Sequence, residues 1–496
     1  MKKNFFKALA LASFLLVGGN ASAQSTEGIP PLDPEYAQMA DEIVAQQLND
    51  PDEANKIFTK LLRKIRNNKE ALLSAGSYFM TKNVYPCANM CSKQLYELAP
   101  DYIPGLMFSG EVAMMRKDYG GAGQKFDEVL MIDSTYVPAL KLNARVYKNV
   151  NPHVAVEMLE RIKRIEPNNY AADKDLGDIA YNLSEYKKAV KSYDEYYKAV
   201  PKTAEALDLR SCENYLQSLY ATQNFEKASA VVNEVEKFDE KDMVFKRMKF
   251  FCGLENAVNS LNYEAEMEKC KEYMGYISNK DYADSLYIYL DYAYAGNLAK
   301  ETGDIPTAIS YYEQALKTDS TKTAGYKELA NLMSRNGQAT SAIPIYRKYI
   351  SMLGEKADLS DAFGLGRLYA AASQQKDLTP EQKAAYVAEG DAVFAEIGEK
   401  KPDNYLAPYM RARINNVDYT KPNETVKKYY EKAIELMGDD ESVNSQKLEA
   451  YKYLIFYGVQ TDDLDLVRKA ADAAAVISPD DTIVKNAITY LKSMNK

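Results

Sequence analysis

A 34-residue pattern recurs along the chain, and it constrains the fold more than any other feature of the sequence. One copy runs over residues 170–203 and another over residues 289–322, with large and small apolar residues at matching positions. A fixed period of this length is typical of stacked helical hairpins, because a single hairpin buries its apolar face only against its neighbours. The pattern therefore predicts an all-α solenoid.

Both copies place small residues where two helices must approach closely and aromatic residues between them. The first copy has Leu176-Gly177, Ala180, Tyr186, Ala189, Tyr193 and Pro201, and the second has Ala295-Gly296, Ala299, Gly303, Ile305, Ala308, Tyr312 and Ala315-Leu316. These residues resemble the tetratricopeptide repeat, a helix–turn–helix unit. The resemblance implies a right-handed superhelical solenoid of about twelve antiparallel hairpins, with a binding groove along its inner surface.

The first 23 residues have the features of a bacterial secretory signal. Three lysines precede an apolar run from Ala8 to Val17, which is too short to span a bilayer, and Ala21-Ser22-Ala23 fits a cleavage site. We expect cleavage near Ala23 and a periplasmic or secreted protein. No later apolar run reaches the roughly 18 residues that a membrane-spanning helix needs, so we expect no integral membrane segment.

Composition shifts and the repeat register divide the rest of the chain. Residues 24–34 contain three Pro and one Gly and are predicted to form a linker. The register is easily followed on both sides of a segment in which it blurs, and the chain ends in an amphipathic stretch. The predicted parts are an N-terminal array over 35–240, an irregular helical hairpin over 241–288, a C-terminal array over 289–479 and a capping helix over 480–496.

Charge and residue usage exclude several function classes. The formal net charge is −9 with both signs interspersed, whereas nucleic-acid binding needs clustered positive charge. The single histidine, His153, makes a His-based metal site or a Ser–His–Asp site improbable, and no phosphate-binding glycine loop is present. We expect no catalytic residue, no metal and no cofactor. The five cysteines are interpreted as small buried side chains.

Candidate binding residues follow from the resemblance, in which positions 5 and 9 of the first helix of each hairpin line the groove. These positions and their neighbours supply several cations and one amide: Lys141, Arg145, Lys327, Asn331, Arg335, Arg367 and Arg413. Lys327-x3-Asn331 resembles half of a carboxylate clamp. Arginine and lysine in a groove favour acidic or carboxylate-bearing peptide, although the same side chains could simply be solvated or pair with nearby acids.

The sequence thus predicts a non-catalytic scaffold that binds a peptide or partner protein, with a role in envelope assembly or secretion. Three alternatives stay open. A glycan- or small-ligand-binding protein of the outer envelope would usually carry exposed Trp, which this chain lacks. An adaptor for envelope assembly differs from the main interpretation only in its partner. An enzyme would need a site within the irregular segment at residues 240–288.

Overall fold

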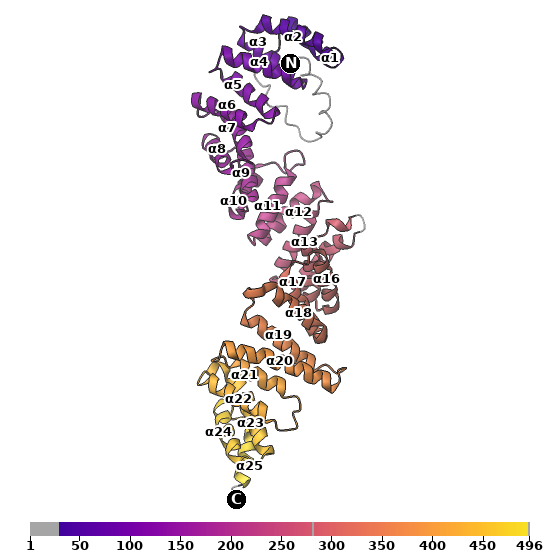
Figure 1. The fold of residues 1–496 in the computed structure, drawn as a ribbon, viewed down its shortest axis with the longest axis vertical. Helices are drawn as coiled ribbons and strands as arrows, with labels where there is room; N and C mark the ends of the chain where they lie inside the picture. Colours follow the sequence, from indigo (N-terminus) through magenta and orange to yellow (C-terminus); the bar gives the residue numbers. More distant parts are fainter. Residues whose placement is uncertain (1–28, 280–281, 495–496) are drawn as a thin grey trace. The chain divides into compact units, whose positions relative to one another are not determined.

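The chain is built from helices throughout the part that the structure describes. The computed structural model describes residues 29–279 and 282–494, which form 25 α-helices and five short 3-10 helices with no strand among them (Figure 1). These α-helices make twelve successive pairs and a last single helix. The expected all-α solenoid of about twelve hairpins is therefore confirmed. The predicted signal peptide, and the linker up to residue 28, lie outside the described residues.

The chain divides into two compact units, residues 1–248 and 249–496, and the division falls inside helix α13. The helices up to that point are α1 Pro34–Asn49, α2 Pro51–Ile65, α3 Lys69–Thr81, α4 Tyr85–Leu98, α5 Ile103–Met115, α6 Tyr119–Ile132, α7 Val137–Tyr147, α8 Pro152–Ile165, α9 Tyr170–Asn182, α10 Tyr186–Ala199, α11 Leu209–Ala221, α12 Phe225–Val235, η1 Glu236–Phe238 and α13 Met243–Val258. The helices that follow are α14 Tyr263–Tyr273, η2 Met274–Ser278, η3 Asp284–Leu286, α15 Tyr289–Glu301, α16 Ile305–Thr318, α17 Thr323–Arg335, α18 Ala339–Leu353, η4 Gly354–Lys356, α19 Leu359–Ser373, α20 Pro380–Lys400, α21 Leu406–Asn415, α22 Glu424–Met437, η5 Glu441–Val443, α23 Asn444–Gln460, α24 Leu464–Ile477 and α25 Thr482–Met494.

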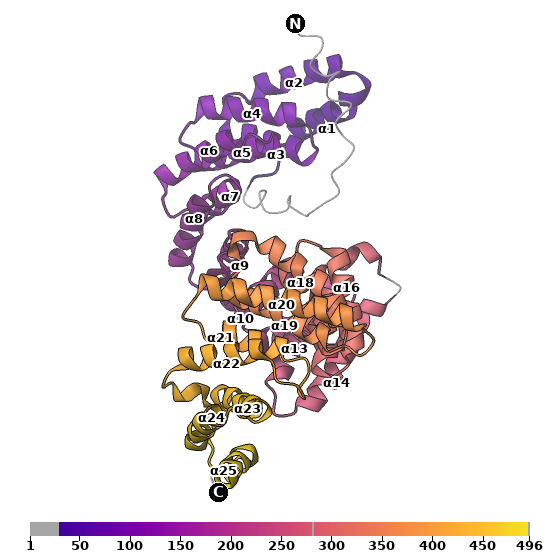
Figure 2. The ribbon, with the colours of Figure 1, turned by 60° about the horizontal axis from the view of Figure 1, so that its bottom comes forward.

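Each helix packs mainly against its neighbours in the sequence. Both ribbon views show this for α23 and α24, which lie side by side with α25 beyond them (Figures 1 and 2). The hairpin starts follow the sequence period, since α3, α5, α7 and α9 begin at Lys69, Ile103, Val137 and Tyr170. Local packing of this kind means that each hairpin completes the core of the next one.

Glycines at the eighth position of the first helix explain how the two helices of a hairpin approach each other. A Cβ atom added to Gly177 would lie 2.6 Å from the ring of Tyr193, and one added to Gly296 would lie 2.7 Å from the ring of Tyr312. Both rings come from the second helix of the same hairpin and are buried. The predicted reason for a small residue at this position is thereby confirmed.

The turns inside the hairpins use a left-handed backbone residue. Asn83, Lys117, Ser184 and Gln223 have φ values between 59° and 61°, and Gly303 and Gly337 occupy the same turn position with φ of 82° and 77°. Only glycine adopts this conformation without a steric cost. The turn geometry is therefore kept even where the sequence supplies an unfavourable residue.

Two 3-10 turns interrupt the succession of α-helices between α13 and α15. Helices α13 and α14 make a hairpin, and the 3-10 turns η2 and η3 separate it from α15. Two of the five cysteines, Cys252 and Cys270, lie on this hairpin, and all five are free and buried, as predicted. Burial raises the pKa of Cys252 to about 12, so its thiol is unreactive near neutral pH.

Candidate partner-binding surface

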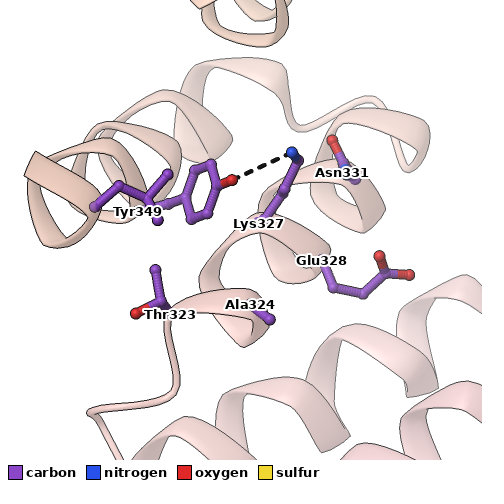
Figure 3. Close-up of a pocket in the computed structure, with 7 residues that line it drawn as sticks. Thr323, Ala324, Lys327, Glu328, Asn331 and Tyr349 are labelled. Atoms are coloured by element: carbon purple, nitrogen blue, oxygen red, sulfur yellow. Dashed lines mark hydrogen bonds between the residues drawn. The ribbon is translucent and has the colours of Figure 1, made fainter. Parts of the chain in front are cut away.

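Helix α17 positions the candidate site because its residues at three- and four-residue spacing share one face. Ala324, Lys327, Glu328 and Asn331 lie on this face, and together with Thr323 and the α18 side chains Tyr349 and Leu353 they line an open hollow of about 510 Å³ (Figure 3). We call it the α17 hollow. Its lining includes the apolar side chains of Ala324 and Leu353 beside an amine, an amide, a carboxylate and a phenol. The hollow therefore combines an apolar contact with polar groups that can fix an orientation.

The Lys327 amine is held in place by neighbours from two other helices. Its Nζ atom lies 2.9 Å from Asp361 Oδ1 and donates to the Tyr349 hydroxyl at 3.2 Å, and that hydroxyl donates to the same carboxylate oxygen at 2.7 Å. Figure 3 shows the amine directed toward the hydroxyl oxygen of Tyr349. An ammonium group has three donors, so two are used within the protein and one remains for a ligand.

Asp361 is the acid that fixes this arrangement. Its other oxygen accepts the backbone N–H of Asp358 at 3.2 Å, which forms a capping box at the start of α19. Burial alone would raise the pKa of Asp361, but hydrogen bonds from Lys327 and Tyr349 outweigh it and leave the pKa below its usual range. The bond to Asp361 in turn raises the pKa of Lys327. Both groups are therefore charged at neutral pH.

The charges lining the α17 hollow are balanced. Glu328 pairs with Lys300 of α15 at 2.9 Å, as Lys327 pairs with Asp361. Asn331 is exposed, and its amide has no hydrogen bond to any residue that the structure describes. The hollow is thus polar and close to neutral, and less cationic than its lysine suggests in the sequence. Its recognition chemistry is hydrogen bonding by Asn331 and Lys327.

The remaining predicted residues fall into two groups. Arg413 on α21 is paired, since its Nε lies 3.3 Å from Glu449 Oε1 and its guanidinium covers the ring of Tyr409. Four cations are exposed and have no ion pair within the described ranges: Lys141, Arg145, Arg335 and Arg367. Arg335 lies on α17, two turns beyond Lys327, and Arg367 lies on α19. The structure brings Lys327 and Asn331 together in one hollow, while Lys141 and Arg145 belong to α7 in the other unit.

Acids and phenols that hold these cations were missed in the sequence. Tyr409 and Tyr430 both donate to Glu449, at 2.8 and 3.0 Å, and so fix the carboxylate that pairs with Arg413. The sequence did contain a signal for such pairs, in the spacing of cations and acids. Lys327 and Asp361 are 34 residues apart, the period of the repeat, and Lys174 and Asp208 of the N-terminal unit, 3.1 Å apart, have the same separation. A cation followed one period later by an acid thus marks a contact between successive hairpins.

Within residues 29–279 and 282–494, no group of three His, Cys, Asp or Glu side chains could hold a metal ion. No helix in the same part of the chain is long and apolar enough to cross a membrane.

Comparison with known families supports the repeat assignment. A family model described as tetratricopeptide repeat matches residues 146–204, which contain α8, α9 and α10. Residues 146–204 of the chain thus match the tetratricopeptide repeat. A TPR repeat-containing protein of Methanocaldococcus jannaschii is 24% identical over 327 residues, which is 63% of this chain and 55% of that protein. The chain thus spans about half the length of this curated relative.

Solved tetratricopeptide repeat structures match parts of the chain. The C-terminal part of a TPR repeat-containing protein from Cytophaga hutchinsonii is 20% identical, with a TM-score of 0.43, and the match covers 55% of this chain and 98% of that structure. A tetratricopeptide repeat protein from Parabacteroides merdae is 12% identical, with a TM-score of 0.33, covering 53% and 98%. Stacked helical repeats of the kind matched at residues 146–204 create extended surfaces on which other proteins can bind.

Proposed function

We propose that this tetratricopeptide repeat protein is a non-catalytic scaffold that holds an extended peptide or a segment of a partner protein against α17 and α19. The α17 hollow carries this proposal. On a single surface it offers the donor of Lys327 and the amide of Asn331 that no described residue engages, together with the apolar side chain of Leu353. Backbone and side-chain groups of a peptide can satisfy such polar groups, which a purely apolar partner would leave unpaired.

Exposed arginines on α17 and α19 suggest that the partner carries carboxylates. Arg335 and Arg367 have no ion pair with any described residue, and an unpaired guanidinium pairs well with a carboxylate. Lys327 and Arg413 contribute less to anion binding, because Asp361 and Glu449 already neutralise them.

Capture of partners from envelope extract tests the proposal. The double variant Asn331→Ala/Arg367→Glu should lose a dominant protein that the wild-type chain retains, with partners identified by mass spectrometry. Arg164→Glu is the matched control, because Arg164 is also exposed and has no ion pair with the residues that the structure describes. Arg413 is left unchanged, because a glutamate at this position would lie beside Glu449 and repel it. Equal capture by both variants, or no protein captured by the wild type, would refute a peptide-binding role for this surface.

We further propose that the protein acts in the periplasm after removal of residues 1–23, in envelope assembly or secretion. The Lys-rich start, the short apolar run and Ala21-Ser22-Ala23 support this location. Cell fractionation with N-terminal sequencing of the purified protein should find a chain that begins at Gln24. A cytosolic protein that keeps Met1 would contradict the proposal.

A further inference from the structure

Helix α2 and the residues just after it form a strongly basic stretch of the sequence. Residues 54–69 contain no acid and six cations, in a chain whose formal net charge is −9: Lys56, Lys60, Arg63, Lys64, Arg66 and Lys69. The opposite side of the helix packs into the first core through Ile57, Phe58, Leu61 and Ile65. The helix must therefore turn its cations to the solvent.

Half of these cations already have partners inside the molecule. Lys56 pairs with Glu53 at 2.8 Å, Lys64 pairs with Glu35 of α1, and Lys69 lies 3.9 Å from Glu70. The other three, Lys60, Arg63 and Arg66, are exposed and have no ion pair with any described residue. We call these three residues the basic face of α2. The helix dipole favours cations at the C-terminal end of a helix, which accounts for Arg63 in the last turn and Arg66 at the C-cap but leaves Lys60 unexplained.

The spacing of the basic face suits a polypeptide. Lys60, Arg63 and Arg66 follow one another at three-residue intervals, so their backbone positions span about 9 Å along the axis. In an extended chain, side chains on the same side are about 6.6 Å apart. Two or three alternating acids can therefore reach the three cations, and each arginine can pair with a carboxylate through two N–H groups.

We propose that the basic face of α2 docks an acidic segment of a partner polypeptide, as a second contact outside the α17 hollow. A short segment experiences only the local charge, because the Debye length is about 8–10 Å at physiological salt. An anionic membrane, in contrast, is an extended plane that would face the acidic surface of the chain as well. Charge complementarity thus favours a peptide over a bilayer.

The basic face contributes to binding mainly by adding to another contact. Exposed ion pairs are individually weak and are screened by salt. A partner already bound at a first site, however, presents its acidic segment at high effective concentration. The segment on its own should therefore bind weakly and depend strongly on salt.

Fluorescence anisotropy of a labelled octaglutamate peptide against the purified chain tests the proposal. Lys60→Glu/Arg63→Glu/Arg66→Glu should weaken binding by about tenfold or more at low salt, as expected for the loss of several charge contacts. The matched control Lys187→Glu/Lys188→Glu/Lys191→Glu changes the net charge equally on α10 and should weaken binding by less than about threefold. The α2 variant leaves Asn331, Arg335 and Arg367 unchanged, so a loss of peptide binding in it reports on the basic face of α2 and not on the α17 hollow.

Three results would overturn the proposal. The first is an equal loss in both charge-reversed triple variants, which would show a response to net charge alone. The second is binding to phosphatidylglycerol vesicles without binding to octaglutamate. The third is self-association in sedimentation velocity that the α2 variant abolishes, because a second copy would then occupy the face. If circular dichroism shows that the α2 variant is unfolded, Lys60→Gln/Arg63→Gln/Arg66→Gln replaces it with the same expected direction.

Discussion

Asp361 shows how a single carboxylate determines what a surface cation can do. Lys327 is 39% exposed and Asp361 only 7%, so the lysine reaches solvent while its anchor does not. The amine is therefore oriented before any ligand arrives, which reduces the conformational entropy that is lost on binding. The same contact removes most of the positive field that the lysine would otherwise project.

Replacing Asp361 with asparagine should destabilise the unit that contains α17 and α19. We expect a loss of about 1–2 kcal/mol, below the value for a fully buried pair because Lys327 is partly solvated. Urea unfolding at pH 7 measures it. Asp358→Asn is the control, since asparagine also caps helices well and the change should cost only a few tenths of a kcal/mol. Equal midpoints for the two variants would mean that the Lys327–Asp361 pair contributes nothing.

The stability lost in Asp361→Asn should depend on pH in one direction only. The pKa of Asp361 is lower in the folded chain than its usual value, which is about 3.9 in an unfolded chain. Its stabilising contribution is therefore complete above about pH 4 and disappears as the pH falls through the folded pKa. The stability difference between wild type and Asp361→Asn should shrink below pH 4. A difference that grows on acidification would contradict this origin.

Glycine positions give a second prediction at the level of single residues. Gly177→Ala should cost about 1–3 kcal/mol, because the added methyl meets the buried ring of Tyr193. Gly120→Ala, also in a helix but with nothing within 4 Å of the new methyl, should instead stabilise the chain by about 0.5 kcal/mol. Thermal unfolding of both variants tests the contrast, and shifts in the same direction would show that the close approach is not what selects glycine.

At the level of elements, the hairpin turn is the least optimised feature. Lys117 and Gln223 adopt φ values of 60° and 61°, and a residue with a Cβ atom in this region costs roughly 1–2 kcal/mol. Asparagine tolerates this region better than most residues, so Asn83 should carry less strain. The turn is imposed by the packing of the two helices, which outweighs the local preference of one residue.

Glycine at these turn positions should therefore stabilise the hairpins. Lys117→Gly and Gln223→Gly should each raise the free energy of unfolding by about 0.5–1 kcal/mol, after the larger entropy loss of glycine is subtracted. Asn83→Gly should gain less, and Gly303→Ala should lose about 1 kcal/mol. Chemical denaturation of the four variants gives the order. A destabilising effect of all three glycine substitutions would show that the turns are unstrained.

Periodicity in the sequence was sufficient to predict the hairpins but not their connecting contacts. Gly177 and Tyr193 predict a close approach of two helices, because both residues belong to the same repeat. Lys327 and Asn331 could be placed on one face from their four-residue spacing alone. Asp361 lies one full 34-residue period after Lys327, but the apolar pattern does not record which charged residues face each other across successive hairpins. Glu449 lies beyond η5, which precedes α23 and displaces that helix from the 34-residue register.

At the level of the whole molecule, the last helix closes the C-terminal core. Val484, Ala487 and Leu491 of α25 are buried, while Lys485, Thr489 and Lys492 between them are exposed. A polar outer side of this kind is what a terminal unit needs for solubility. The stability of α23 and α24 should therefore depend on α25 more than the stability of distant hairpins does.

Removing residues 480–496 should have a graded effect along the chain. Hydrogen exchange should accelerate most in α23 and α24 and less in α21 and α22, with no change in α3 to α10, because each hairpin contacts only its neighbours. Exchange followed by mass spectrometry resolves these segments. A uniform loss of protection over the whole chain would instead indicate a single cooperative fold.

The 34-residue separation of Lys174 from Asp208 and of Lys327 from Asp361 also bears on how such a gene can change. An in-frame duplication that spans both hairpins of such a pair copies the cation together with its acid. Gain or loss of a partial repeat separates them and leaves a charge without its counterpart. The ion pairs between hairpins thus favour changes of chain length in whole repeats. The array can then lengthen or shorten over evolutionary time while the contacts between successive hairpins are kept.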